Sequence, residues 1–283
     1  MKLGIDVGST TVKLVLLDDK NNIVYSRYER HMSNVFEKVA ELLNELYDEK
    51  GDLELKPVIT GSGGLSLANV FGIKFEQEVI SCSYAVEKLI PQTDVAIELG
   101  GEDAKITFYG SSVEQRMNGT CAGGTGAFID QMAVLLNTDA AGLNEAAKDY
   151  GIIYPIASRC GVFAKTDIQP LINDGAKTSD IAASIFQAVV NQMISGLACG
   201  HPIKGNVAFL GGPLEYLSEL RQRFVETLNL KEENIIFPEN AKYFVALGAA
   251  YLADYEESVK LSELNDRIKN ANPDDIADTK YLQ

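Results

Sequence analysis

The sequence lacks several features that would assign a protein to a class at first sight. It has no uninterrupted run of about 18 apolar residues, so we expect no transmembrane helix. Residues 1–8 (MKLGIDVG) contain an acid and two glycines where a secretion signal would carry apolar residues. We therefore expect a cytoplasmic protein. The motif Gly-x-x-x-x-Gly-Lys-Ser/Thr is also missing, which excludes a P-loop.

Basic residues are scarce as well. Lys and Arg number 25 against 40 Asp and Glu, which gives a formal net charge of −15. An acidic chain does not attract phosphodiester backbones, so nucleic acid is not expected as a partner, and the charge is better explained by solubility. With 46% hydrophobic and 23% charged residues over 283 positions, the composition suits a soluble protein of one large domain or two lobes.

The chain has four cysteines but no Cys-x-x-Cys motif. By motif, therefore, one subunit does not supply a complete four-ligand metal site. Disulfides are disfavoured in a reducing cytosol, so metal or redox roles gain weight. Cys82 and Cys199 lie in helical contexts and are expected to be core residues.

Cys121 lies in the stretch around which the rest of the chain is organised. Four glycines surround it within eight positions: Gly119, Gly123, Gly124 and Gly126. An apolar helical pattern begins at Ala127, which places Cys121 just ahead of a helix N-terminus. Backbone N–H groups and the helix dipole there favour a thiolate, or an anionic group that the thiolate holds. A tight turn with an incidental cysteine is the alternative, and Cys160, which also precedes an expected helix, weighs against it.

Two segments, residues 3–17 and 95–108, repeat one pattern. Each reads as an apolar strand, an acid, a glycine turn, a lysine and a second apolar strand. The acids are Asp6 and Glu98, and a lysine follows each by seven positions, at Lys13 and Lys105. This pattern indicates an internal duplication of one β-hairpin.

The two hairpins carry the groups that a nucleotide phosphate site needs. Such a site uses backbone N–H donors, hydroxyls and a carboxylate that holds hydrated Mg²⁺. The first hairpin offers Asp6, Gly8, Ser9, Thr10, Thr11 and Lys13, and the second offers Glu98, Gly100, Gly101, Glu102 and Asp103. A later glycine turn, Gly211-Gly212-Pro213, lets backbone approach a flat ring such as adenine. Each glycine turn alone is consistent with a plain β-turn. The three turns in this order together indicate a nucleotide site.

The remaining chain alternates strands and helices, as expected for an α/β protein. Strands are predicted over 23–28, 56–60, 206–210 and 234–237, and helices over 35–47, 80–89, 127–136, 139–149, 178–199, 214–228 and 245–251. The last helix consists of small residues, including Gly248, which allows close packing. From about residue 254 the chain is polar, and we expect a tail or a linker, in what could be the front part of a longer polypeptide.

Taken in order, these motifs resemble the sugar kinase/actin/heat-shock chaperone ATPase superfamily. The resemblance implies two ribonuclease H-like lobes with ATP in the cleft, with lobe I at 1–90 plus about 240–255, lobe II at 91–239 and a tail at 256–283. Asp6, Glu98 and Asp103 would then be catalytic, and the nucleotide residues would include the hairpin turns, Gly211, Gly212, Pro213 and Gly248.

Within that superfamily, Cys121-Ala-Gly-Gly-Thr-Gly and Cys160-x-Val-Phe-Ala resemble the activators of 2-hydroxyacyl-CoA dehydratases and the related benzoyl-CoA reductase ATPase subunits. The match covers residues 1–253. It implies a homodimer that holds one 4Fe–4S cluster through Cys121 and Cys160 of each chain. It further implies ATP/ADP and Mg²⁺ as cofactors, reduced ferredoxin or flavodoxin as the electron source, and a dehydratase or related reductase as the electron acceptor.

One departure concerns the second hairpin. Many family members carry Asp-x-Gly-Gly-Gln-Asp there, whereas this chain has Glu98-Leu-Gly-Gly-Glu-Asp103. The Glu form is more similar to the long activases, in which such a module is fused to further domains. The alternative function is a small-molecule kinase of the same fold without a cluster, with Asp130 or Asp167 as the base for its acceptor hydroxyl.

Overall fold

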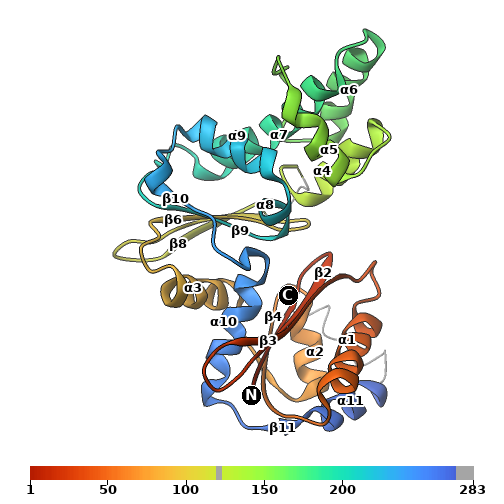
Figure 1. The fold of residues 1–283 in the computed structure, drawn as a ribbon, viewed down its shortest axis with the longest axis vertical. Coiled ribbons are helices and arrows are strands. Elements are labelled where there is room, and N and C mark those ends of the chain that lie inside the picture. The colour runs from red at the N-terminus through yellow and green to blue at the C-terminus, as the bar shows by residue number, and fades with distance from the viewer. Residues whose placement is uncertain (119–122, 272–283) are drawn as a thin grey trace. The chain divides into compact units, whose positions relative to one another are not determined.

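The computed structural model describes residues 1–118 and 123–271 (Figure 1). The chain divides into two compact units. Unit 1 comprises Met1–Pro91 and the chain from Tyr243 onward, and unit 2 comprises Gln92–Lys242. The first boundary falls at residue 91 instead of the predicted 90, and the second at 242 instead of 239.

Unit 1 is built on a mixed sheet of the strand order β11-β4-β1-β2-β3, with β5 also paired to β4. β1 is antiparallel to β2 and parallel to β4, so β1 is a central strand and all its residues are buried. The strands are β1 (Lys2–Val7), β2 (Thr11–Leu17), β3 (Ile23–Arg30), β4 (Glu54–Thr60), β5 (Lys74–Phe75) and β11 (Val259–Lys260).

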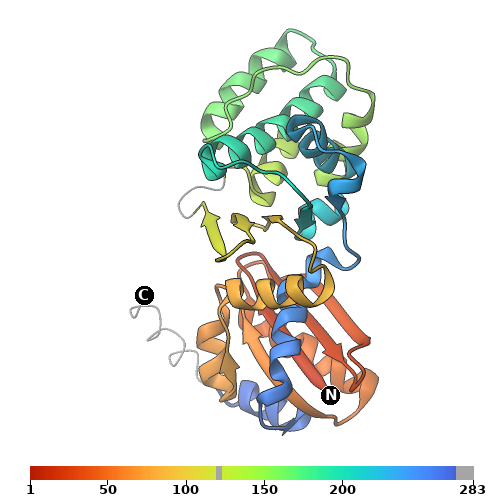
Figure 2. The ribbon, with the colours of Figure 1, turned by 90° about the vertical axis from the view of Figure 1, so that its left-hand side faces the viewer.

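Helices cover both faces of the unit 1 sheet. Their bounds are α1 (Val35–Lys50), α2 (Gly64–Phe71), α3 (Glu78–Leu89), α10 (Phe244–Leu252) and α11 (Leu261–Lys269), with short 3₁₀ turns at Ala241–Tyr243 and Ala253–Tyr255. α1, α2 and α11 lie on one face, and α10, with α3 beside it, lies on the other (Figures 1 and 2). α1 forms as predicted because its apolar residues recur at helical spacing and are buried: Val39, Leu42, Leu43 and Leu46.

The predicted polar tail is wrong for residues 256–271. β11 pairs antiparallel with β4, and α11 buries Leu261, Leu264 and Ile268 in the core of unit 1. These three residues recur at intervals of three and four, which places them on one face of the helix. The prediction rested on the polar composition of the segment, and the charged residues on the other faces of α11 dominate that composition. Residues 272–283 lie outside the described chain, so the prediction is untested there.

Unit 2 repeats the same organisation around a five-stranded sheet of order β10-β9-β6-β7-β8. Its strands are β6 (Val95–Leu99), β7 (Ala104–Phe108), β8 (Glu114–Met117), β9 (Val207–Leu210) and β10 (Ile235–Ile236). β6 is antiparallel to β7 and parallel to β9, as β1 is to β2 and β4. Asp6 lies opposite Lys13 across the first hairpin, and Glu98 lies opposite Lys105 across the second. The predicted hairpin duplication is therefore confirmed in register.

Helices complete unit 2. They are α4 (Gly126–Leu135), α5 (Ala140–Ala146), α6 (Gly161–Asn173), α7 (Thr178–Asn191), α8 (Gly212–Tyr216) and α9 (Ser218–Leu228), with 3₁₀ turns at Ala147–Asp149 and Glu232–Asn234. α7 continues as a π-helix over Gln192–Ala198. By length and hydropathy the 21 residues 178–198 could cross a membrane, but 67% of the most apolar window is buried within the protein. We therefore assign α7 as the core helix of unit 2.

Candidate functional site

The first hairpin places Asp6 at the carboxyl end of a buried central strand. Asp6 is 2% exposed, and its Oδ2 lies 2.8 Å from Lys13 Nζ on the paired strand. Burial alone would lower the pKa of Lys13, but the Asp6 carboxylate together with Tyr28 and Glu78 outweighs it and raises that pKa above its ordinary value. The two groups therefore form a buried ion pair next to the turn that begins at Gly8, whose N–H donates to the Thr11 carbonyl at 3.0 Å.

Within the described part of the chain, the second carboxylate oxygen of Asp6 makes no hydrogen bond. Asp6 Oδ1 is buried without a hydrogen bond to any described residue, and so is the hydroxyl of Thr60, which lies opposite Asp6 on β4. A buried acceptor left unpaired costs free energy unless a ligand completes it. A carboxylate oxygen of this kind suits a hydrated Mg²⁺ ion, so the residues present fit the predicted cation.

The loop after β4 also belongs to this site, and the sequence analysis did not assign it there. Gly61 has a φ of +92°, and a Cβ at this position would come within 2.6 Å of Asp6 Oδ1 and 2.3 Å of the Val7 carbonyl oxygen. Only glycine lets the loop pass this close to the Asp6 carboxylate. The signal that could have found it is the run Gly61-Ser62-Gly63-Gly64 directly after a strand parallel to β1.

The second hairpin arranges its charges differently. Glu98 is 9% exposed, and Lys105 Nζ lies 3.6 Å from Glu98 Oε1 but 2.8 Å from Asp103 Oδ2. The Gly100 N–H donates to the Asp103 carbonyl at 2.9 Å, and a Cβ on Gly100 would lie 2.0 Å from Asp103 Oδ1. The structure therefore brings Glu98, Asp103 and the Gly100 turn together, with Glu102 exposed beside them.

The same turn holds the start of α4. The Gly126 N–H donates to the Gly100 carbonyl at 3.0 Å, and the Ala127 N–H donates to the Gly101 carbonyl at 2.7 Å. A Cβ on Gly126 would lie 3.3 Å from Pro213 Cγ, so the Gly211-Gly212-Pro213 turn lies against the same helix end. The helix that follows the Cys121 stretch thus begins against the glycine turn of the second hairpin.

Of the two predicted cluster ligands, Cys121 lies outside the described residues and Cys160 caps the N-terminus of α6. The Phe163 and Val162 N–H groups in the first turn of α6 lower the pKa of the Cys160 thiol below its ordinary value. A Cβ on Gly123 would lie 2.6 Å from the Arg159 carbonyl oxygen. The end of the Cys121 stretch therefore packs against the residue that precedes Cys160.

Three further predictions concern residues away from these turns. Gly248 lies in α10 against α3, where a Cβ would come within 1.7 Å of the Ser81 carbonyl oxygen. Helix packing accounts for this glycine, and its role in nucleotide binding stays a prediction. Cys82 is buried, as expected, but Cys199 is exposed, because the chain leaves the helix there with a φ of 47°.

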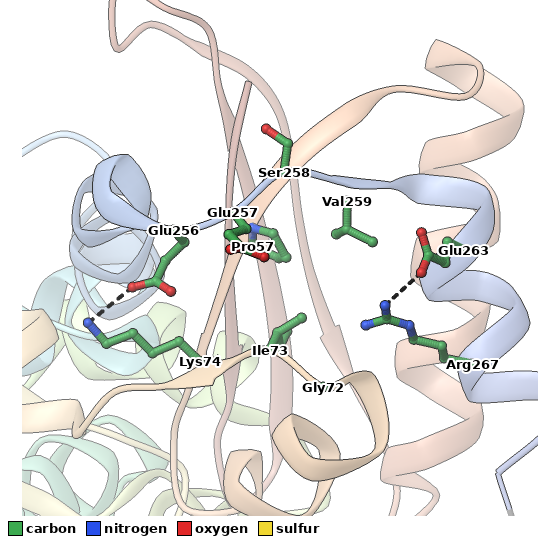
Figure 3. A pocket seen from close by; sticks show the side chains of 10 residues that line it. All are labelled: Pro57, Gly72, Ile73, Lys74, Glu256, Glu257, Ser258, Val259, Glu263 and Arg267. Atoms are coloured by element: carbon green, nitrogen blue, oxygen red, sulfur yellow. Dashed lines mark hydrogen bonds and ion pairs between the residues drawn. The ribbon is translucent and has the colours of Figure 1, made fainter.

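A pocket of about 420 Å³ in unit 1 contains none of the predicted site residues. It lies between β4, β5 and the C-terminal segment, and Figure 3 shows an ion pair at each end of it. Lys74 Nζ is 3.3 Å from Glu256 Oε1, and Arg267 Nη2 is 2.7 Å from Glu263 Oε1. Glu257 also lines the pocket, so three acids face two bases there, and we assign no ligand to it.

A comparison with protein families identifies the chain through nearly its whole described length. Residues 3–253 match the model of the BadF/BadG/BcrA/BcrD ATPase family. The chain belongs to this family. The resemblance inferred from the two hairpins and the cysteine motifs is thereby confirmed.

Relatives and solved structures agree with the family. The chain is 30% identical to a 2-hydroxyisocaproyl-CoA dehydratase activator of Clostridioides difficile, over 95% of this chain and 98% of that one. It is 31% identical to the (R)-2-hydroxyglutaryl-CoA dehydratase activating ATPase of Acidaminococcus fermentans, over 91% and 98%. The structure of the Clostridium difficile activator with bound ADPNP matches with a TM-score of 0.76 at 27% identity, covering 96% of this chain and 98% of that one.

A more distant structure shows how widely the fold is shared. A ROK family glucokinase from Streptomyces griseus matches with a TM-score of 0.51 at 14% identity, over 89% of this chain and 98% of that one. This likeness shows the fold alone. Together with the activator, it confirms the predicted actin/sugar kinase/heat-shock chaperone ATPase fold.

Proposed function

We propose that this protein is an ATP-hydrolysing iron–sulfur activator that passes a low-potential electron to a 2-hydroxyacyl-CoA dehydratase or a related CoA-ester reductase. Membership of an ATPase family and the names of the relatives support the ATPase and activator parts. The observation that carries the redox part is Cys160, a partly exposed thiol with a lowered pKa at a helix N-terminus, next to the Cys121 stretch.

The described residues fit a shared cluster better than a metal site within one chain. Among residues 1–118 and 123–271, no group of three or more His, Cys, Asp or Glu side chains could hold a metal ion. Cys121 precedes Gly123 by two positions in the sequence, and Gly123 packs against the residue before Cys160, so we propose Cys121 as the second ligand. Two chains would then supply the four thiolates that a 4Fe–4S cluster needs. A bound cluster would supply a one-electron carrier.

The surroundings of Cys160 support pairing with a second copy of the chain. Val162 and Phe163, the residues at the start of α6, are 68% and 64% exposed. Large apolar side chains exposed side by side are typical of an interaction surface. In a homodimer through the cluster, these side chains would be buried and would shield the thiolates from water.

The first-hairpin carboxylate and the turn amides would bind Mg²⁺ and the nucleotide phosphates. The hydrogen bonds from Gly126 and Ala127 to the Gly100 and Gly101 carbonyls give a direct route by which a change at the second hairpin would move α4 and the Cys121 stretch. We propose that nucleotide state controls electron release through this contact. Reduced ferredoxin or flavodoxin would supply the electron.

The alternative, a kinase without a cluster, gains no support from its candidate bases. Asp167 Oδ2 accepts a hydrogen bond from the Ala157 N–H at 2.7 Å, which gives this carboxylate a structural role. Asp130 also has an interaction within the protein. The likeness to a glucokinase concerns the fold and not the acceptor site.

Replacing each cysteine separately tests the proposal. After anaerobic reconstitution, Cys121→Ser and Cys160→Ser should lose the visible absorption and the iron of the cluster while keeping their affinity for ADPNP. Cys199→Ser is the matched control, because this cysteine is exposed but matches no family cysteine motif, and it should stay fully loaded. Retention of the chromophore in both ligand variants would show that the ligand assignment is wrong.

A further inference from the structure

His31, which follows β3, is held in place by every polar group that it has. It is 6% exposed. Its N–H donates to the Thr10 carbonyl at 3.2 Å, and its own carbonyl accepts from the Asn34 N–H at 2.7 Å. Its ring Nδ1 accepts from the Ser33 N–H at 3.1 Å, and Nε2 lies 3.1 Å from the Gly8 carbonyl oxygen. His31 therefore connects the end of β3 to the Gly8 and Thr10 carbonyls in the turn of the first hairpin.

These contacts fix the state of the imidazole ring. Because the Ser33 N–H donates to Nδ1, that nitrogen carries no proton. The Gly8 carbonyl can only accept, so Nε2 carries the proton and donates it to this oxygen. The ring is a neutral donor aimed at the Gly8 carbonyl.

The backbone that delivers the ring is strained. Met32 and Ser33 have φ values of 46° and 68°, in the left-handed region that non-glycine residues rarely adopt. Two such residues in succession cost free energy and persist where the surroundings require them. The Met32 side chain is 74% exposed, so its burial does not explain the conformation. We infer that the strained conformation of Met32 and Ser33 serves to place the His31 ring.

The consequence for the turn follows from peptide geometry. In a planar trans peptide unit, the carbonyl of one residue and the N–H of the next point in opposite directions. With the Gly8 carbonyl held toward His31, the Ser9 N–H points away from it, and the Thr10 carbonyl sets the Thr11 N–H in the same way. We propose that His31 is a positioning residue that presents the turn amides to the nucleotide phosphates.

Two substitutions separate the contacts of the two ring nitrogens. His31→Gln can place an N–H near the position of Nε2 and keep the bond to Gly8. His31→Asn can keep an acceptor near Nδ1 for Ser33 but cannot reach Gly8. The matched control is His201→Asn, which removes the only other histidine of the chain. The full-length proteins are titrated with Mg²⁺-ADPNP and, separately, with adenosine, which has no phosphates.

The inference rests on the proposed nucleotide-binding role of this hairpin, and it is independent of the cluster. His31→Asn should weaken ADPNP binding about three- to tenfold, the worth of one hydrogen bond. Its adenosine affinity should be unchanged, and His31→Gln and His201→Asn should bind both ligands like the wild type. Comparable Tm values for the two His31 variants would confirm that folding is not the cause.

Each contrary result has its own meaning. Wild-type-like ADPNP binding by His31→Asn would overturn the positioning role alone. Equal losses for ADPNP and adenosine, or a larger loss in His31→Gln than in His31→Asn, would show that His31 only supports the local fold. A wild-type protein that does not bind ADPNP would overturn both this inference and the proposed nucleotide function.

Discussion

The buried pair of Asp6 and Lys13 makes a quantitative prediction about stability. Replacing Lys13 with Met keeps the length and volume of the side chain but removes its charge. The Asp6 side chain is 3% exposed, Lys13 is its cation in the described chain, and Asp6 Oδ1 already lacks a partner. Removing one partner of a buried ion pair typically costs about 3–5 kcal/mol. We expect Lys13→Met to lower the free energy of unfolding by about 3 kcal/mol or more.

Urea unfolding followed by circular dichroism measures this loss. Lys38→Met is the matched control, since Lys38 lies 2.6 Å from Glu41 on a solvent-facing turn of α1, where Glu41 is 53% exposed. Solvent-exposed ion pairs contribute little to stability, so this variant should unfold like the wild type. The double variant Asp6→Asn, Lys13→Met should recover part of the loss, because no buried charge is left unpaired. If Lys13→Met costs no more than the control, the reasoning about a buried charge is refuted.

Two further predictions concern Asp180 and Gly248. The Gly151 and Ile152 N–H groups donate to Asp180 Oδ1 and hold the pKa of this carboxyl below its ordinary value of 3.8. The resulting stabilisation is present above pH 3.8 and is lost as the pH falls through the folded-state pKa of Asp180. Asp180→Asn should therefore lower Tm at neutral pH. It should also make Tm fall less steeply with pH in the acidic range. An unchanged slope in that range would contradict this. Gly248→Ala should lower the free energy of unfolding by about 1–3 kcal/mol through the clash with α3, and ADPNP affinity should stay unchanged if helix packing is its role. A loss of ADPNP affinity without a loss of stability would support the predicted nucleotide role of Gly248.

The two hairpins could be predicted from the sequence because their chemistry is local. The acid, the glycine turn and the lysine of each lie within eight residues, so spacing alone places Asp6 opposite Lys13. Other parts of the site depend on contacts between distant segments. His31 reaches Gly8 across 23 residues, and Gly61 reaches Asp6 from the next parallel strand. No local sequence pattern predicts such contacts, because only the tertiary structure brings the groups together.

The predictions for the C-terminal segment and for Cys199 were wrong for related reasons. The charged residues of α11 outnumber its apolar ones, so the sequence reads as a polar tail. Its three buried apolar side chains can be recognised as a core face only once the core of unit 1 is known. Cys199 continues the apolar pattern of α7 in the sequence. In the structure the π-helix ends at Ala198, and Cys199 itself adopts a left-handed backbone conformation that leaves its side chain exposed. A periodic pattern predicts that a helix exists better than it predicts where the helix ends.

The measurement that tests the central claim most directly is the iron and acid-labile sulfide content of the anaerobically reconstituted wild-type protein. The account predicts about two iron atoms and two sulfides per chain, in a brown dimer that carries one 4Fe–4S cluster. A colourless protein that contains no iron and still binds ADPNP would contradict the redox role and leave a nucleotide-binding protein of the same fold.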